Sequence, residues 1–242
     1  MGDKMPSFNI STDKILQGVH EDGLYKIPNF LDQDEIDTLK EEMSQAFSIM
    51  STGDELCYPN ETSKCYPFGK ICRVGRDDMG HFPNMRSLFS DNWFSELTDK
   101  YFQCPNEKML QVFFSHEYVA SSSADGVTRN SVLHFDPYEA FKFMIYINDC
   151  DQNNGAFRYI KGSHVDGKNT RQQYPLGELL QDKYRLDQNP QLSSKYSEDN
   201  VTYASATAGS LLVFTTDVLH GGGIIQEQGL ERMGIICHNR RA

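Results

Sequence analysis

Three side chains of this sequence have the types and the spacing to hold one divalent metal ion. His134 and Asp136 are separated by a single residue, and residues i and i+2 of an extended strand point to the same face. His220 ends an apolar run that begins at Gly209 and is followed by three glycines, a pattern that predicts a buried strand closed by a turn. We therefore expect the two imidazoles and the carboxylate to meet at one metal.

The composition of this donor set favours one type of metal chemistry. Two histidines and one carboxylate on one face of a metal leave the opposite positions open, which is the arrangement of non-haem Fe(II) oxygenases. A His-x-Asp triplet alone carries little weight, because a chain with 7 histidines and 34 acidic residues produces one by chance fairly often. The same ligands could hold zinc in a hydrolase, or a metal in a cupin-like barrel that only binds a ligand.

Arg232 discriminates between these alternatives. It stands at the head of an apolar strand, residues 233–237, where a guanidinium is costly to bury without an anionic partner. The planar fork of arginine grips a carboxylate with two parallel hydrogen bonds, so a dicarboxylate cosubstrate is a natural partner. Neither a hydrolase nor a non-catalytic barrel needs an arginine that binds a carboxylate at this position. The sequence therefore favours an oxygenase.

The order of these motifs resembles the phytanoyl-CoA dioxygenase-like branch of the Fe(II)/2-oxoglutarate-dependent oxygenases. Residues 21–40 are similar to the N-terminal strand and helix of that family, and residues 133–137 to its metal-binding strand. Residues 153–164 resemble its Asn-Gly-Ala to Gly-Ser-His segment, with Lys161 where proline is common, and residues 209–232 carry the distal histidine and the arginine. The resemblance covers most of the chain and implies a double-stranded β-helix.

The resemblance also implies a reaction. Fe(II) would be held by His134, Asp136 and His220, with open positions for 2-oxoglutarate and O2, while Arg232 would bind the distal carboxylate. Decarboxylation of 2-oxoglutarate to succinate and CO2 then accompanies oxidation of an unactivated C–H bond, most often hydroxylation. Desaturation, cyclisation and oxidative demethylation would use the same residues, whereas related halogenases lack the carboxylate ligand. We expect the substrate to be a small molecule, an amino acid or a secondary metabolite.

Five further side chains are candidates for the pocket. Gln111 lies on a predicted strand upstream of the metal triplet, where its amide could donate to a carboxylate of the cosubstrate, as a comparable glutamine does in related enzymes. Tyr138, Lys142, Tyr146 and Arg158 are candidates for binding the substrate. For each of them a packing or solvated role is an open alternative.

The secondary-structure pattern predicts an α+β, mainly β fold. A helix is expected from Asp32 or Asp34 to about residue 50, turn-rich irregular chain over 51–82, and a second helix over 85–102. Strands are expected over 109–115 and 141–147, which are rich in aromatic and β-branched residues. Helices followed by strands favour a jelly-roll core flanked by N-terminal helices.

The chain is predicted to form a single domain over residues 1–242. A single domain is expected because the two histidine ligands lie on distant segments that must fold together. Within it, helical support would take about residues 1–105 and the jelly-roll core about 106–242. A polar insert over about 165–203, together with the loop 120–130, would cover the mouth of the barrel as a lid.

Charge and hydropathy limit the partners. A net charge of -11 argues against nucleic acid, whose binding depends on clustered lysine and arginine. We find no stretch of about 18 apolar residues that would span a membrane and no apolar signal core near the start, so a cytoplasmic protein without membrane partners is expected. The sequence makes no prediction of the oligomeric state.

Overall fold

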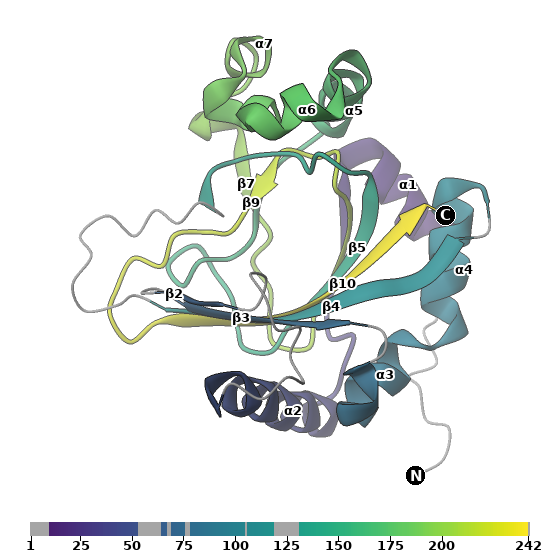
Figure 1. Ribbon diagram of the computed structural model, residues 1–242, viewed down its shortest axis with the longest axis vertical. Helices are drawn as coiled ribbons and strands as arrows, with labels where there is room; N and C mark the ends of the chain where they lie inside the picture. Colours follow the sequence, from purple (N-terminus) through teal and green to yellow (C-terminus); the bar gives the residue numbers. More distant parts are fainter. Residues whose placement is uncertain are drawn as a thin grey trace.

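Two antiparallel sheets face each other in this protein, with helices packed against their outer sides (Figure 1). The computed structural model describes residues 10–52, 64–66, 69–75, 78–104, 106–118 and 131–241. The larger sheet has the strand order β1-β8-β5-β10-β4-β3-β2, and the smaller sheet the order β7-β6-β9. This architecture confirms the predicted α+β, mainly β fold with a jelly-roll core.

The larger sheet consists of β1 (Leu24–Ile27), β2 (Lys64–Tyr66), β3 (Gly69–Gly75), β4 (Asn106–Tyr118), β5 (Ala140–Tyr146), β8 (Leu211–Thr215) and β10 (Glu231–Arg241). The smaller sheet consists of β6 (Arg158–Ile160), β7 (Val201–Tyr203) and β9 (His220–Gly221). Strands β1, β2 and β3 precede residue 106, so the first part of the chain supplies sheet as well as helical support.

The described residues before β4 include the α-helices α1 (Thr12–Asp22), α2 (Gln33–Thr52), α3 (Pro83–Phe89) and α4 (Asn92–Phe102). Their apolar side chains form one core with the outer face of the larger sheet. Alternation along β10 places Ile235 and Cys237 in that core, while Ile236 and His238 face the opposite side and line a cavity. Strand β5 is buried at all seven positions, because both of its faces are covered.

Helix α2 begins as the sequence predicts. The side chain of Asp32 accepts a hydrogen bond from the backbone N–H of Glu35 at 3.0 Å, and the carboxylate of Glu35 accepts one from the N–H of Asp32 at 2.9 Å. This reciprocal capping box satisfies two backbone donors at the helix start. The predicted apolar stripe on this helix is buried in the main core: Ile36, Leu39, Met43 and Phe47.

Two local predictions were wrong, and one helix was not predicted. The expected helix 85–102 is two helices: α3 ends at Phe89, and Asp91 caps α4 by accepting from the N–H of Trp93 at 2.8 Å. The expected irregular stretch 51–82 contains β2 and β3: β2 pairs with β3, and β3 pairs with β4, a partner distant in sequence. Helix α1 was not anticipated. In the described part of the chain, no helix combines the length and the apolar character needed to cross a membrane.

The insert that begins near residue 165 is mostly helical. It contains α5 (His164–Gln173), α6 (Leu176–Glu178) and α7 (Pro190–Ser193) and returns through β7. Leu179, Leu186 and Leu192 of the insert pack with Leu133, Phe135, Ile160 and Leu219 behind the smaller sheet. Figure 1 shows these helices on the side of the molecule opposite to α2. The loop 120–130, the other proposed lid segment, lies outside the described residues.

Glu42 offers a test of how the helices are held together. Its buried carboxylate accepts hydrogen bonds from the N–H of Asn84, the side-chain amide of Asn84 and the N–H of Met85, at 2.7, 2.9 and 2.9 Å, and so joins α2 to the start of α3. Glu42→Ala should lower the free energy of unfolding in urea by roughly 3 kcal/mol, since buried N–H groups lose a charged acceptor. The exposed neighbour gives the control: Glu41→Ala should cost less than about 0.5 kcal/mol, and equal losses would contradict this role.

Candidate active site

His134, Asp136 and His220 form one cluster between the two sheets. One ligand atom from each of the three residues lies within 4.8 Å of the others. The backbones of the two histidines pair with each other, with His134 N–H donating to the His220 carbonyl at 2.9 Å and His220 N–H to the His134 carbonyl at 2.7 Å. This pairing sets the spacing of the two imidazoles before any metal is bound.

The segments that carry these residues differ from the expected strands. The run 209–220 is not one strand: β8 ends at Thr215, and the chain then turns into the smaller sheet before His220. His134 lies in isolated bridges to His220 and Arg185 rather than in a continuous strand. The sharp change of direction after Thr215 lets the chain pass from one sheet to the other, which an uninterrupted apolar run does not reveal.

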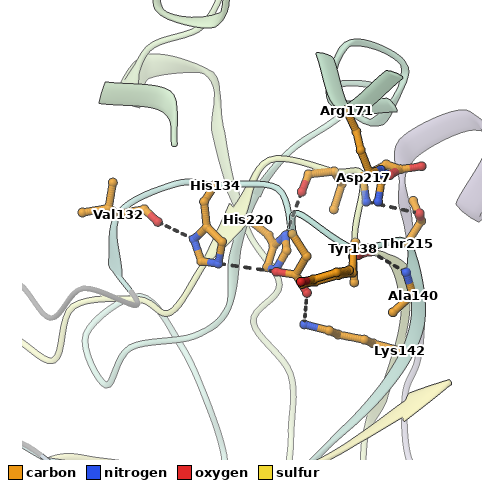
Figure 2. A network of polar contacts seen from close by, with 12 residues as sticks. Val132, His134, Tyr138, Ala140, Lys142, Arg171, Thr215, Asp217 and His220 are labelled. Carbon is orange, nitrogen blue, oxygen red and sulfur yellow. Dashed lines mark hydrogen bonds and ion pairs between the residues drawn. The ribbon is translucent and has the colours of Figure 1, made fainter. Parts of the chain in front are cut away.

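The helical insert supports the metal-binding segment from behind. Phe135 N–H donates to the Tyr184 carbonyl at 3.1 Å, and Leu186 N–H donates to the Leu133 carbonyl at 2.8 Å. Arg171 of α5 pairs with Asp217 in the turn that leads to His220 (Figure 2). Among the described residues, the insert contributes nothing to the cavity wall, so its contacts position the candidate ligands.

Both histidines are held in the tautomer that suits a metal. Nδ1 of His134 lies 2.7 Å from the Val132 carbonyl, and Nδ1 of His220 lies 2.7 Å from the Val218 carbonyl. A carbonyl only accepts, so each Nδ1 carries the proton and each Nε2 presents its lone pair. The two Nε2 atoms lie 3.7 and 3.6 Å from Oδ1 of Asp136. This donor set fits a divalent transition metal.

The electrostatics favour the metal-binding protonation states. Burial, with a smaller contribution from His134, lowers the pKa of His220 to about 3. Burial also lowers the pKa of His134, against the opposing effect of Asp136. Burial alone would raise the pKa of Asp136, but Lys142 and the two histidines hold it below its usual range. Neutral imidazoles beside an ionised carboxylate are the forms that bind a metal.

Lys142 is the direct partner of the candidate carboxylate ligand. Its Nζ lies 2.6 Å from Oδ2 of Asp136, and Figure 2 shows its side chain directed toward the histidine cluster. The carboxylate therefore turns one oxygen to the lysine and the other to the imidazoles. This pairing orients Asp136 and adds a positive charge that stabilises its ionised form.

A cavity of about 440 Å³ opens beside the cluster. Its floor is the inner face of the larger sheet, where side chains of β10 and β4 stand opposite each other: Arg232 with Glu117, Ile236 with Phe113, and His238 with Gln111. Its volume falls in the range of roughly 300–1,000 Å³ that is usual for small-molecule sites.

Arg232 has an anionic partner within the protein. Its Nη2 lies 2.5 Å from Oε2 of Glu117, and its Nη1 donates to the carbonyl of Gly155. Gly222 lies against this guanidinium, since a Cβ at this position would lie 2.7 Å from Nη2 and would displace it. Glu117 was missed in the sequence, since only the register between β10 and β4 places it opposite Arg232.

Four weaker candidates divide into two groups. Gln111 and Tyr138 line the cavity. Tyr146 and Arg158 are not among the described residues of its wall. The Tyr146 hydroxyl donates to the Ala204 carbonyl at 3.2 Å and accepts from the N–H of Phe157 at 2.8 Å.

Arg158 also has a structural environment. It donates to a carboxylate oxygen of Glu198 at 2.8 Å and to the Ser131 carbonyl. Phe157, the residue before β6, lines the cavity instead, because successive residues of an extended chain point in opposite directions. Arg73, His238 and Arg240 line the cavity without having been proposed for it.

Residues 19–233 match the family described as Phytanoyl-CoA dioxygenase (PhyH). The chain belongs to this family. It is therefore a 2-oxoglutarate-dependent non-haem iron oxygenase, which confirms the class that the sequence motifs predicted.

Two named dioxygenases are similar over nearly the whole chain. Dioxygenase olcK of Penicillium canescens is 23% identical over 272 residues, which cover 98% of this chain and 75% of that protein. Dioxygenase cdmA of Talaromyces verruculosus is 21% identical over 246 residues, which cover 95% of this chain and 73% of that protein. The crystal structure of the epimerase SnoN with Fe3+, alpha ketoglutarate and nogalamycin RO has the same fold, with a TM-score of 0.64, 14% identity and coverage of 96% of this chain and 84% of that chain.

The lowered pKa values predict an unusual pH profile for metal binding. Because the imidazoles of His134 and His220 are already neutral near pH 7, Co(II) affinity should change little between about pH 8 and about pH 6, and should fall only as the pH drops toward the lowered pKa values. Lys142→Met should move this loss of affinity to higher pH, since Lys142 lowers the pKa of both histidines and of Asp136. Calorimetric titration measures both effects. Lys168→Met, on the exposed side of α5, is the control, and identical profiles for both variants would contradict the assignment.

Proposed function

We propose that the protein hydroxylates an unactivated C–H bond of a small secondary metabolite, with conversion of 2-oxoglutarate to succinate and CO2. One observation carries this proposal: two imidazole Nε2 atoms and a carboxylate oxygen converge in a cavity whose wall also contains a buried arginine. The cluster supplies the donors for iron, and the arginine supplies the charge for a dicarboxylate.

In this proposal His134, Asp136 and His220 hold Fe(II), which when bound activates O2 with electrons from the decarboxylation of 2-oxoglutarate. The protein contributes fixed geometry, because the histidine backbones pair with each other and each Nδ1 is held by a carbonyl. The surrounding apolar side chains limit the access of water: Met144, Phe157 and Phe214.

Arg232 is proposed to bind the distal carboxylate of 2-oxoglutarate. Its guanidinium lies against Gly222, two residues beyond His220, so the arginine and the metal cluster adjoin the same segment. Glu117 holds this guanidinium in the absence of cosubstrate. We infer that the incoming carboxylate takes the place of Glu117, an exchange of one anion for another that keeps the buried arginine paired throughout.

Gln111 is better suited to the substrate than to this carboxylate. It lies six residues from Glu117 along β4, a separation of roughly 20 Å at the rise of an extended strand. Its cross-strand neighbour is His238 rather than Arg232. We therefore propose that Gln111, with Tyr138, contacts the substrate.

A secondary metabolite is favoured as the substrate class by the known relatives. The fold neighbour SnoN was crystallised with nogalamycin RO, and the cavity here combines apolar walls with a few polar groups, the usual design of a small-molecule site. The neighbour SnoN is an epimerase, so the same fold supports reactions other than hydroxylation. The mass of the product separates these outcomes, because hydroxylation adds one oxygen atom to the substrate.

The most direct functional test is anaerobic addition of Fe(II) and 2-oxoglutarate. The wild-type protein should develop the charge-transfer absorption of the chelate and, once O2 is admitted with candidate metabolites, should form succinate. Asp136→Ala should abolish both signals, whereas Asp199→Ala, at an exposed position, should preserve them. Failure of the wild-type protein to give either signal would leave the oxygenase proposal without support and favour a barrel that only binds a ligand.

The proposed exchange at Arg232 makes Glu117 informative. Without cosubstrate, Glu117→Gln should lower the free energy of unfolding by about 3 kcal/mol, because a buried guanidinium loses its charged partner. Added 2-oxoglutarate should stabilise this variant more than the wild type and bind to it more tightly, while Arg232→Met should mainly weaken 2-oxoglutarate binding.

Thermal unfolding with and without 2-oxoglutarate measures how much the cosubstrate stabilises each variant. Titration of the chelate absorption measures how tightly each variant binds 2-oxoglutarate. Glu231→Gln provides the control, since that partly exposed carboxylate flanks Arg232 but pairs with His116. Equal stabilisation of the wild type and Glu117→Gln would contradict the exchange.

A further inference from the structure

The turn formed by residues 215–219 contacts two of the three candidate metal ligands. The Thr216 carbonyl accepts a hydrogen bond from the N–H of Asp136 at 2.9 Å, and the Val218 carbonyl lies 2.7 Å from Nδ1 of His220. The chain leaves this turn directly into His220. The conformation of the turn therefore affects the position of the carboxylate and of the second imidazole.

The side chain of Thr216 joins the turn to the segment that carries Asp136. Its hydroxyl donates to the Tyr138 carbonyl at 3.1 Å and accepts from the N–H of Ala140 at 2.8 Å. The N–H of Thr216 also donates to the Ala140 carbonyl at 3.0 Å. Thr216 is buried, where such hydrogen bonds are stronger than in water, so a shift of the turn would carry Asp136 with it.

One side of helix α5 holds the turn from the outside, beginning at the N-cap residue Ser163. Ser163, Gly167 and Arg171 occupy every fourth position, so they lie on one side of the helix. The Ser163 hydroxyl is buried and accepts a hydrogen bond from the N–H of Leu219 at 2.8 Å. Helix α5 therefore fixes the residue that comes directly before the second candidate imidazole.

Gly167 and Arg171 contact the middle of the turn. A Cβ at Gly167 would collide with the Asp217 carbonyl oxygen, so a glycine is what lets α5 approach the turn this closely. One helical turn further along, Arg171 forms an ion pair with Asp217, whose side chain is only 4% exposed (Figure 2). A buried carboxylate is costly without such a partner, so the pair holds α5 and the turn together.

These contacts give α5 a task at the metal site. Among the described residues, those of the insert line no part of the cavity, whereas three positions of α5 contact the turn behind it. Groups that orient metal ligands from behind raise metal affinity, because the ligands are already in place when the metal arrives.

We propose that Arg171 and Ser163 are positioning residues for the metal site, which act through the 215–219 turn on Asp136 and His220. This inference rests on the proposed function, because it takes these two residues as metal ligands. It assigns helix α5 of the insert to the preorganisation of the metal site.

Titration of the metal-free protein with Co(II) tests this proposal, followed by calorimetry and by the visible absorption of the bound ion. Arg171→Met should weaken Co(II) binding about tenfold or more, the usual effect of losing a group that orients a metal ligand, and should alter the absorption bands. Arg171→Lys should recover most of the affinity, since an ammonium group can still pair with Asp217. Ser163→Ala should weaken binding about fivefold, the equivalent of one ordinary hydrogen bond, and carries the test if Arg171→Met does not fold.

Lys168→Met provides the control, because it removes a charge from the exposed side of the same helix and should leave affinity and absorption unchanged. Circular dichroism at the titration temperature separates loss of folding from loss of affinity. The proposal is overturned if the folded Arg171→Met or Ser163→Ala variant binds Co(II) as tightly as the wild type, or if Arg171→Lys is as weak as Arg171→Met. Absence of Co(II) binding by the wild type would instead contradict the proposed function itself.

Discussion

The reciprocal backbone hydrogen bonds between His134 and His220 are the constraint on which the rest of the site depends. They join a segment that precedes β5 to a short strand of the smaller sheet, and they fix the two imidazoles next to each other. Each Nδ1 is then held by a carbonyl, which leaves both Nε2 atoms directed at Asp136. The turn after β8 and the helical insert contact these two segments and so hold the pairing in place.

Strand β10 contributes residues both to the apolar core and to the wall of the cavity. Its outward residues, such as Ile235 and Cys237, belong to the core beneath the N-terminal helices, so the strand is anchored by apolar burial. Its inward residues form a series along the cavity, from Arg232 at one end to His238 and Arg240 at the other. One strand therefore sets the separation between the proposed cosubstrate end and the proposed substrate end.

The sequence reveals the candidate site more fully than its surroundings. His134, Asp136, His220 and Arg232 stand out by residue type and spacing, and the fold places them around one cavity. Glu117 could not be found in this way, because its meeting with Arg232 depends on the register of two strands far apart in sequence. Arg158 on β6 was likewise proposed for the pocket, whereas the arginines that line the cavity in the described part of the chain lie on β3 and β10. Alternation shows which residues share a face but not which face meets the cavity.

A crystal structure of the protein with Mn(II) and 2-oxoglutarate, grown without O2, tests the central claim most directly. The account predicts a metal bonded to Nε2 of His134, Nε2 of His220 and Oδ1 of Asp136, with the distal carboxylate of 2-oxoglutarate on Arg232 in place of Glu117. A metal bound by other residues would contradict the account. So would a cosubstrate lying between Arg73 and Arg240 while the pair of Arg232 and Glu117 stays intact.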